Sequence, residues 1–314
     1  MCWLIVTPAR NEADNLVGLA QTLVDQDCSL IGLWVVVDDG STDGTSTCLP
    51  ESLPFPVHVL RREQGGGLAN ASEFAAFTFG ADAGFAMCSD ATRVMKLDAD
   101  VRLAPGYLAA LADTPASIGL VTGRIGGRGE TSRRDFTRGP LKCYSREAYA
   151  IVRELPVALG WDVVDEVALR RSGLEVRVVD DAHATVARRT GSSEGLLRGR
   201  RRAGVVSRWT GYHPVYFALR LLRYAVKRPL LLGSVVMAWS WATSGPGPFA
   251  SELRATHRGE QVARLQGLFR VRSLTGGAGR VRASAVPPPP SHSDANPADL
   301  AAVADAARRA EAKV

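Results

Sequence analysis

Short apolar runs alternate with polar loops and amphipathic segments in the first third of the chain. Two of these runs, 3–7 and 33–38, are continuous, which is typical of strands that are covered on both faces of a sheet. Between them, apolar residues recur at helical spacing, at Leu16, Leu19, Ala20, Leu23 and Val24. The pattern therefore predicts a strand, an amphipathic helix and a second strand.

The same alternation continues as far as residue 97. We predict further strands at 57–60 and 94–97 and a helix over 72–83. Strands that alternate with helices form a mostly parallel, doubly wound α/β sheet, which binds ligands at the carboxyl ends of its strands. The polar loops after the first, second and fourth strands lie at that edge, so we expect them to form one site.

Two carboxylates stand at the end of the fourth predicted strand. Asp98 and Asp100 are two positions apart, so an extended chain directs both to the same face. Mg²⁺ and Mn²⁺ prefer carboxylate oxygens and leave their remaining positions to water and phosphate. The pair predicts a site for one of these ions, and the alternative is a polar turn that closes a buried strand.

Composition limits the class of protein. A chain of 314 residues that is 46% hydrophobic has room for one large domain with appendages. Its five cysteines are scattered and include no Cys-x-x-Cys pair, which favours reduced thiols in the cytoplasm over a disulfide framework or a zinc site. The first strand follows the initiating residue directly, so we expect no signal peptide.

The net charge of +6 is concentrated in one stretch. Residues 196–229 contain nine Arg or Lys residues and no Asp or Glu, so the remainder of the chain is slightly acidic. The basic character is therefore local, which favours an anionic surface as partner rather than a generally basic fold, and we expect no nucleic-acid partner.

Six segments resemble, in order and spacing, the motifs of family 2 glycosyltransferases with the GT-A fold. They are Pro-Ala-Arg-Asn-Glu at 8–12, Val-Val-Val-Asp-Asp-Gly-Ser-Thr-Asp-Gly-Thr at 35–45, Lys-Leu-Asp-Ala-Asp at 96–100, Arg-Gly-Pro-Leu-Lys-Cys-Tyr at 138–144, Gly-Trp-Asp-Val-Val-Asp-Glu at 160–166 and Thr-Gly-Ser-Ser-Glu-Gly at 190–195. Each motif alone is weak, but six in register are specific. The resemblance implies a Rossmann-like GT-A sheet and an enzyme that uses nucleotide sugars.

The resemblance also implies which residues bind the nucleotide. Pro8, Arg10 and Glu12 correspond to the nucleotide-binding loop, in which Glu12 accepts hydrogen bonds from the ribose hydroxyls. Asp39 corresponds to the carboxylate that reads the edge of the base, whereas Asp38 supports the loop. The alternative for Asp39 is a helix cap or a turn residue.

The metal site follows from the same comparison. Asp98 is expected to contact the sugar or ribose and to lie beside the ion, and Asp100 is expected to bind Mg²⁺ or Mn²⁺ on the diphosphate. Such an ion stabilises the negative charge that develops on the leaving diphosphate. His183 is a weaker candidate ligand, because relatives carry theirs nearer Val186, and the alternative is a surface histidine.

Three acids are candidates for the catalytic base. Asp162, Asp165 and Glu166 have the spacing of one face of a helix that we predict to end at Gly173. Acids are favoured in the first turn of any helix, which is the alternative explanation. A carboxylate within hydrogen-bond reach of the acceptor hydroxyl would remove its proton. In relatives the base occupies the position of Asp162, and Asp165 is the close rival.

The C-terminal third has a different character. Residues 215–226 form an apolar helix on which Arg220, Arg223 and Lys227 share one face, a signal for binding at a membrane surface. Residues 230–242 are uncharged but too short to span a bilayer, which takes about twenty residues. We predict an interfacial or re-entrant segment. The alternative is a helical hairpin that packs on the catalytic domain or on a second subunit of a homodimer.

These patterns predict three regions: a GT-A catalytic domain at 1–195, a basic and apolar helical extension at 196–272 and a disordered tail at 273–314. The predicted function is metal-assisted transfer of a sugar, with inversion, from a nucleotide-diphosphate sugar to a hydroxyl acceptor in cell-envelope or other glycan synthesis. The acceptor is expected to be lipid-linked, a polysaccharide or a secondary metabolite. The predicted location is the cytoplasm, at the inner face of the cell membrane. The alternatives are a nucleotidyltransferase and a non-catalytic, membrane-docked nucleotide-sugar-binding protein.

Overall fold

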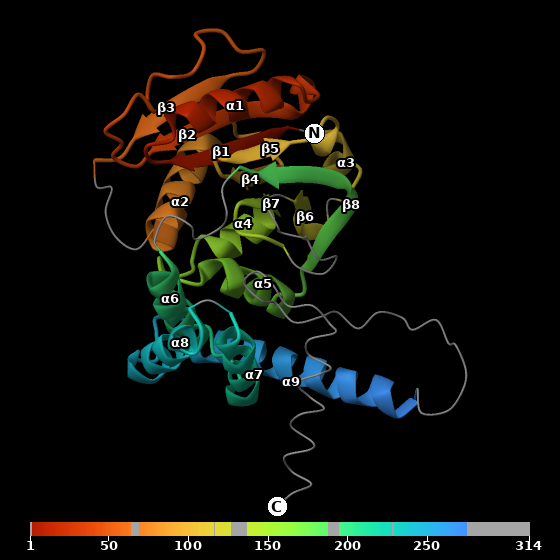
Figure 1. The fold of residues 1–314 in the computed structure, drawn as a ribbon. Helices are drawn as coiled ribbons and strands as arrows, with labels where there is room; N and C mark the ends of the chain where they lie inside the picture. The colour runs from red at the N-terminus through yellow and green to blue at the C-terminus, as the bar shows by residue number, and fades with distance from the viewer. Residues whose placement is uncertain are drawn as a thin grey trace, which may run out of the picture. The chain divides into compact units, whose positions relative to one another are not determined.

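The computed structural model describes residues 2–63, 69–115, 117–126, 137–187, 195–227 and 229–274 (Figure 1). Contacts divide the chain into two compact units, Met1–Thr190 and Gly191–Val314, and each is described by itself. The division of the chain at 195 and 272 stays a prediction, and nearly all of the predicted tail lies outside the described residues.

An eight-stranded sheet forms the centre of the first unit, in the spatial order β3-β2-β1-β4-β7-β6-β8-β5. The strands are β1 (Trp3–Ala9), β2 (Ile31–Asp38), β3 (Val57–Arg61), β4 (Arg93–Leu97), β5 (Val101–Leu103), β6 (Ile118–Gly126), β7 (Leu141–Ser145) and β8 (Glu175–Val186).

The sheet is mixed, whereas the sequence predicted a mostly parallel one. The four strands from β3 to β4 in the spatial order are parallel, and so are β6 and β8. In contrast, β7 is antiparallel to β4 and β6, and β5 is antiparallel to β8. The backbone N–H of Asp98 donates to Pro140 O at 2.9 Å, so β7 begins where β4 ends and must run the opposite way.

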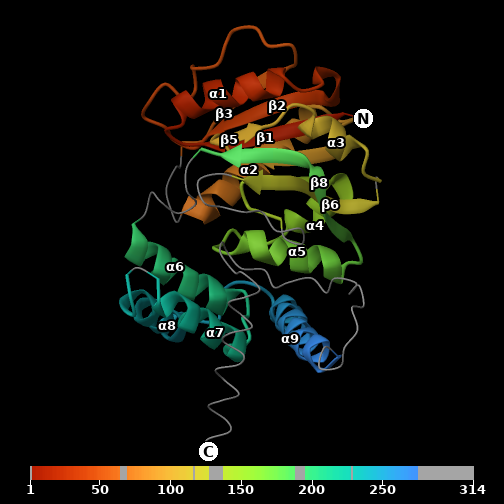
Figure 2. The same ribbon diagram turned by 45° about the vertical axis from the view of Figure 1, so that its right-hand side comes forward.

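Helices cover both faces of the sheet (Figures 1 and 2). Helices α1 (Ala13–Val24) and α3 (Tyr107–Ala112) share one apolar core with alternate residues of the strands. Helices α2 (Ala69–Met87), α4 (Arg146–Val152) and α5 (Trp161–Arg171) lie on the opposite face, and a 3-10 turn, Cys28–Leu30, precedes β2. The strand–helix alternation predicted for the first hundred residues is thus present.

Close packing of α2 on the sheet depends on two glycines. A Cβ on Gly84 would lie 2.5 Å from Leu4 Cδ1, and one on Gly80 would lie 2.7 Å from Val6 Cγ1. Both distances are shorter than any van der Waals contact, so the helix approaches β1 only because these positions carry no side chain. Leu4 and Val6 are fully buried as a result.

The second unit contains four helices among its described residues: α6 (Leu196–Trp209), α7 (Pro214–Ala225), α8 (Leu232–Thr243) and α9 (Ser251–Leu274). Its small core is built from Tyr212, Tyr216, Phe217, Tyr224 and Met237. No helix in the described part of the chain is both long enough and apolar enough to cross a membrane.

Candidate active site

The polar loops after β1 and β2 are bound to each other at the carboxyl edge of the sheet. The N–H groups of Asn11 and Glu12 donate to Ser41 Oγ at 3.0 Å and to Thr45 Oγ1 at 2.9 Å. In return, Asn11 Oδ1 accepts from the N–H of Thr42 at 2.9 Å. Asn11 has a φ of 55°, a conformation that asparagine tolerates better than most residues. The two loops therefore form one preformed surface.

Asp38 holds the second of these loops in shape. Its buried carboxylate accepts hydrogen bonds from the Ser41 N–H at 2.8 Å and from Ser46 Oγ. Burial alone would raise the pKa of Asp38, but these hydrogen bonds outweigh it and lower the pKa below its usual value. Asp38 thus supports the loop.

Asp39 is also buried but has a different set of partners. Its N–H donates to Ala9 O at 2.8 Å, which ties the end of β2 to the end of β1. Its carboxylate accepts from Ser72 Oγ and lies 3.0 Å from Arg62 NH1. The carboxylate is thereby held at the edge of the loop surface with its charge compensated, and its role in reading the base stays a prediction.

The other predicted nucleotide ligands lie on the same edge. Pro8 is near the end of β1 and is half-buried, Arg10 is exposed, and Glu12 accepts from Asn15 Nδ2 at 2.6 Å at the start of α1. The structure brings these three residues and Asp39 together on one surface, and contact with a nucleotide stays a prediction for each of them.

A buried lysine organises the end of β4. Lys96 Nζ is fully buried and contacts Asp98 Oδ1 at 2.5 Å, Gly139 O at 2.8 Å and the carboxylate of Glu73. Burial would lower the pKa of Lys96, but the carboxylates of Asp98 and Glu73 more than compensate and raise it above its usual value. One oxygen of Asp98 is therefore already engaged by a protein cation.

A second buried lysine lies directly opposite the first. The antiparallel register of β4 and β7 pairs Lys96 with Lys142, and each ammonium lies 5.7 Å from the ring centroid of Trp161. Lys142 Nζ donates to Asp165 Oδ2 at 2.6 Å, which also accepts from Tyr144 OH at 2.6 Å. The side chains of Lys142 and Tyr144 are both fully buried.

Two of the three acids on α5 are buried and contact neighbouring side chains. Asp165 is completely buried between Lys142 and Tyr144, and burial raises its pKa to about 6. Glu166, also buried, accepts from Thr137 Oγ1 and from Arg170 NH1 at 3.0 Å. Both carboxylates therefore have internal partners, and those of Asp165 join α5 to β7.

Asp162 has a different environment from the other two acids. Its side chain is half-buried, and a Cβ on Gly139 would lie 3.1 Å from its Oδ2. The carbonyl of Gly139 in turn accepts from Lys96, which holds Asp98. Asp162 is therefore connected to the Asp98 carboxylate at the end of β4 through Gly139 and Lys96.

Asp100 and His183 are separated by the register of β8. Asp100 is half-buried, and its carbonyl accepts from the Ala187 N–H at 2.9 Å. His183 is exposed, and its carbonyl accepts from the Ala104 N–H. His183 precedes Ala187 by four positions, which corresponds to about 13 Å of extended chain. His183 as a metal ligand stays a prediction, and this register disfavours it.

Sequence reasoning missed Glu73 and Gly139. Glu73 comes from α2 and Gly139 from the turn before β7, so neither belongs to the segment that contains Asp98. The available signal was Lys96 itself, because a lysine inside an apolar strand needs carboxylate partners. Most of the predicted motif at 190–195 lies outside the described residues.

Comparison with known proteins decides the class of enzyme. Residues 4–156 match the model of a protein family described as Glycosyl transferase family 2. The protein is a family 2 glycosyltransferase. The predicted family and the prediction of an enzyme are thereby confirmed, and the nucleotidyltransferase and non-catalytic alternatives are set aside.

The solved structures that the chain resembles include a mannosyltransferase. The mannosyltransferase PcManGT from Pyrobaculum calidifontis, in complex with GDP-Man and Mn²⁺, is 17% identical, with a TM-score of 0.50 over 87% of this chain and 80% of that one. S. aureus TarS 1-349 is 14% identical, with a TM-score of 0.48 over 77% of this chain and 71% of that one. Of these two structures, only the mannosyltransferase reaches a TM-score of 0.50. At 17% identity, its similarity shows the mixed α/β fold alone. No curated protein sequence matches the chain.

The buried pair of Lys142 and Asp165 makes a prediction for stability. Lys142→Met should lower the free energy of unfolding by about 3 kcal/mol, because it leaves the Asp165 carboxylate buried without its cation. Urea denaturation of the full chain measures the change. Adding Asp165→Asn should recover a large part of the loss, because the amide oxygen still accepts from Tyr144.

The matched control is an ion pair at the surface. Arg153 lies 3.1 Å from Asp82, and both side chains are more than 40% exposed, so Arg153→Met should cost less than about 1 kcal/mol. Equal losses in Arg153→Met and Lys142→Met would show that the buried pair has no special role.

Proposed function

We propose that the enzyme transfers a sugar from a nucleotide-diphosphate sugar to a hydroxyl acceptor, with help from a divalent metal and with inversion at the anomeric carbon. The observation that carries the proposal is the separation of the three acids on α5. Asp165 and Glu166 are buried in internal contacts, whereas Asp162 is half-buried beside Gly139 at the end of β4. This supports Asp162 as the base.

The donor is assigned to the joined loops after β1 and β2. Their backbone and side-chain hydrogen bonds form a preorganised surface at the carboxyl edge, with Glu12 and Asp39 on it. The mannosyltransferase of similar fold was solved with GDP-Man, which supports a nucleotide sugar here as well. The donor surface is preformed, so binding requires little reordering of the loops.

Asp100 is the residue that we assign to the metal. Asp98 Oδ1 is engaged by Lys96, so Asp98 is better suited to contact the sugar. One half-buried carboxylate, with diphosphate oxygens and water as further ligands, fits the preference of Mg²⁺ or Mn²⁺. When bound, such an ion would stabilise the charge on the departing diphosphate. The mannosyltransferase of similar fold was solved with Mn²⁺.

The acceptor hydroxyl loses its proton to the Asp162 carboxylate as its oxygen attacks the anomeric carbon. The new C–O bond forms on the face opposite the diphosphate, which leaves with the electron pair of the broken bond. Attack from the opposite face inverts the configuration of that carbon. A general base of this kind contributes about 10²- to 10⁴-fold to the rate.

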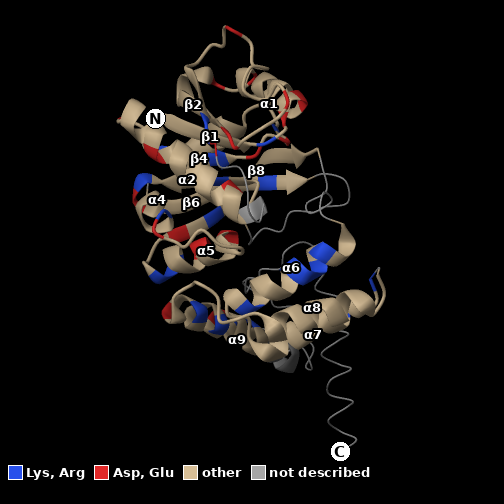
Figure 3. Ribbon diagram, turned by 90° about the vertical axis from the view of Figure 1, so that its left-hand side faces the viewer, with Lys and Arg blue, Asp and Glu red and all other residues tan. Residues whose placement is uncertain are grey.

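The helices α7 and α8 direct large apolar side chains outward. The exposed apolar surface of the second unit comprises Leu196, Leu197, Val215, Leu222, Val226, Leu230, Leu231, Leu232, Val235 and Trp239. Exposed patches of this kind mark membrane or protein interaction sites. The basic residues of α6 lie in the same unit (Figure 3), which favours an anionic membrane over a neutral partner.

One expectation about α7 needs correction. The sequence placed Arg220, Arg223 and Lys227 on a face that meets the membrane. Arg220 is instead buried, with NH1 3.3 Å from Ser207 Oγ and its guanidinium 5.3 Å from the Tyr212 ring. The helical period is right, but Arg220 faces the core together with Phe217 and Tyr224, whereas Val215, Leu222 and Val226 are exposed. The proposed location is still the cytoplasmic face of the cell membrane, with a lipid-linked glycan acceptor.

The metal assignment predicts that Asp100→Ala lowers transfer by about 10²- to 10³-fold, because the developing diphosphate charge loses its stabilisation. A screen of nucleotide sugars with Mn²⁺, read by release of the nucleoside diphosphate, measures the rate. Asp181→Ala, which removes an exposed acid on β8, is the control and should keep full activity. Full activity of Asp100→Ala, or of the native enzyme in excess chelator, would remove the metal from the mechanism.

The base assignment predicts that Asp162→Asn lowers kcat by at least about 100-fold with an unchanged donor KM, because the base acts on the acceptor. Thermal unfolding is the second readout. Asp165→Asn should lower the melting temperature, since it weakens the contact with Lys142, whereas Asp162→Asn should leave it near that of the native protein. A fully stable but inactive Asp165→Asn variant beside an active Asp162→Asn would reassign the base.

The membrane proposal predicts that the full chain co-sediments with phosphatidylglycerol vesicles at low salt and is only partly released by high salt. Each basic residue near the surface contributes about 1 kcal/mol that salt weakens. Inserted apolar side chains add a part that salt does not remove, so Leu231→Ser with Trp239→Ser should make release complete.

Val157→Ser is the control for this experiment, because Val157 is an exposed valine of the first unit. That variant should sediment like the native chain. If the native chain stays in the supernatant at low salt, the apolar surface is not a membrane contact. A concentration-dependent dimer in sedimentation equilibrium would then identify a second subunit as its partner.

A further inference from the structure

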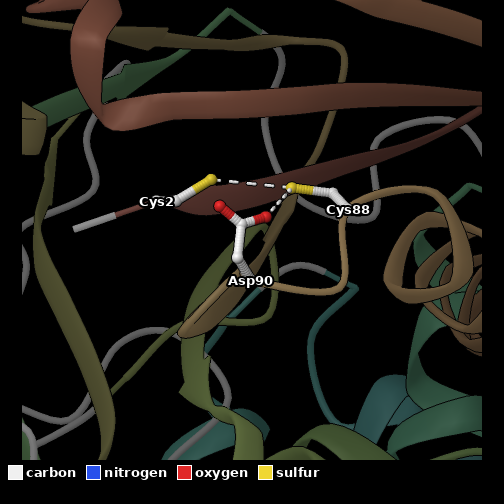
Figure 4. Close-up of side chains that lie close together, drawn as sticks. All are labelled: Cys2, Cys88 and Asp90. Carbon is white, nitrogen blue, oxygen red and sulfur yellow. Dashed lines mark hydrogen bonds between the residues drawn. The ribbon is translucent and has the colours of Figure 1, made fainter.

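Two cysteines and an aspartate meet at the edge of the sheet away from the catalytic loops (Figure 4). Cys2 precedes β1, Cys88 follows α2, and Asp90 lies shortly before β4. Cys2 Sγ is 3.5 Å from Cys88 Sγ, which is 3.4 Å from Asp90 Oδ1. The length of β1, about 20 Å, separates this cluster from the loop that carries Glu12.

We infer that Cys2, Cys88 and Asp90 form a binding site for a thiophilic divalent cation, with Zn²⁺ as the fitting ion. Within the described residues, this is the one group of three ligating side chains whose donor atoms all lie within 4.8 Å of one another. Two thiolates, a carboxylate and one water would complete a tetrahedral shell. All three residues are at least partly exposed, so an ion can enter from solvent.

The distances between the donor atoms match such a shell. Tetrahedral Zn–S bonds of about 2.3 Å place two sulfurs about 3.8 Å apart, and a Zn–O bond of about 2.0 Å places oxygen about 3.5 Å from sulfur. The observed sulfur–sulfur distance of 3.5 Å and sulfur–oxygen distance of 3.4 Å are close to these values. A disulfide would instead bring the two sulfurs to about 2.05 Å and remove the thiol that donates to Asp90.

Backbone hydrogen bonds hold the three ligands in place. The Thr92 N–H donates to Cys2 O at 2.9 Å and so joins the start of β1 to the approach to β4. The Ala91 N–H donates to Cys88 O at 3.2 Å, which closes the turn that carries Asp90. Arg146 NH2 donates to the carbonyls of Ser89 at 2.7 Å and Ala91 at 3.0 Å, which fixes this turn from the outside.

Gly32 makes room for the two sulfurs. A Cβ at this position of β2 would lie 2.0 Å from Cys2 Sγ and 3.0 Å from Cys88 Sγ. The thiols are therefore packed against the backbone of β2, with no side chain between them and the strand. Gly32→Ala should displace Cys2 Sγ without removing any ligand, which tests the geometry of the site.

The proposed site differs in chemistry from the metal site assigned to Asp100. Thiolate sulfur selects Zn²⁺, whereas carboxylate and phosphate oxygens suit Mg²⁺ and Mn²⁺. A cation held by Cys2 and Cys88 would tie the first strand to the connection between α2 and β4. Its contribution would be to stability, since a ligand that binds only the folded state stabilises that state.

The test uses the full-length, reduced protein and the metal alone. We expect it to bind one equivalent of Zn²⁺ in competition with a chromophoric chelator, with a rise in melting temperature. Bound Co²⁺ should show the thiolate-to-cobalt charge-transfer band and the intense visible bands of a tetrahedral site. Cys88→Ser leaves Cys2 as the one thiolate, so it should at least halve the charge-transfer band. It should also weaken Zn²⁺ binding by at least about 100-fold, because even the loss of a ligand's supporting partner costs 10- to 100-fold.

Four further variants keep the test decisive. Asp90→Asn changes an exposed residue and should weaken binding by about tenfold with an unchanged fold. Cys48→Ser removes a half-buried thiol outside the cluster and should bind as the native chain does, as should Asp100→Ala. Gly32→Ala should weaken binding. Absence of stoichiometric Zn²⁺ or Co²⁺ binding by the reduced protein overturns the inference, as does a charge-transfer band of native intensity in Cys88→Ser.

Discussion

The two buried lysines that face each other across β4 and β7 constrain the whole catalytic edge. Each ammonium loses its hydration, at a cost of several kcal/mol, and so requires a carboxylate in contact with it. Lys96 is matched by Asp98 and Glu73, and Lys142 by Asp165. These pairs connect α2, β4, β7 and α5, which are remote in sequence. The position of the acids at the end of β4 therefore depends on charge compensation inside the fold.

This constraint also gives acids on one helix different environments. Asp162 and Asp165 are less than one turn apart on α5, and the helix dipole favours acids in this turn. Lys142 treats them differently, because its ammonium donates to the side-chain carboxylate of Asp165 but to the backbone carbonyl of Asp162. The carboxylate of Asp162 lies near Gly139, in the turn before β7.

The sequence predicted the features that depend on local pattern. Apolar runs located the first, second and fourth strands, and turn-rich loops located the edge on which Glu12, Asp39 and Asp98 lie. It did not predict that β7 enters between β4 and β6, because that pairing joins residues far apart in the chain. The opposition of Lys96 and Lys142 follows from that pairing and was missed with it.

Residue spacing was an equally poor guide to the cysteines and to α7. Cys2 and Cys88 form no Cys-x-x-Cys motif, yet parallel β1 and β4 bring the chain segments before them together. On α7, the period of the sequence placed Arg220, Arg223 and Lys227 on one face but could not say which face was buried. The Tyr212 and Tyr224 rings contact the Arg220 guanidinium and replace part of its hydration, so this side chain can be buried.

The second unit has small residues at one helix contact and large apolar residues on its surface. Where α6 meets α8, a Cβ on Gly204 would lie 2.1 Å from Ser240 Oγ, so the helices approach through small residues. Leu231, Val235 and Trp239 on α8 face outward instead. Burial of each such side chain would stabilise the unit by about 1.5–3 kcal/mol, but these three side chains are not part of its core. A helical unit built in this way is most stable against an apolar surface outside itself, which is the physical basis for proposing that it docks on a membrane.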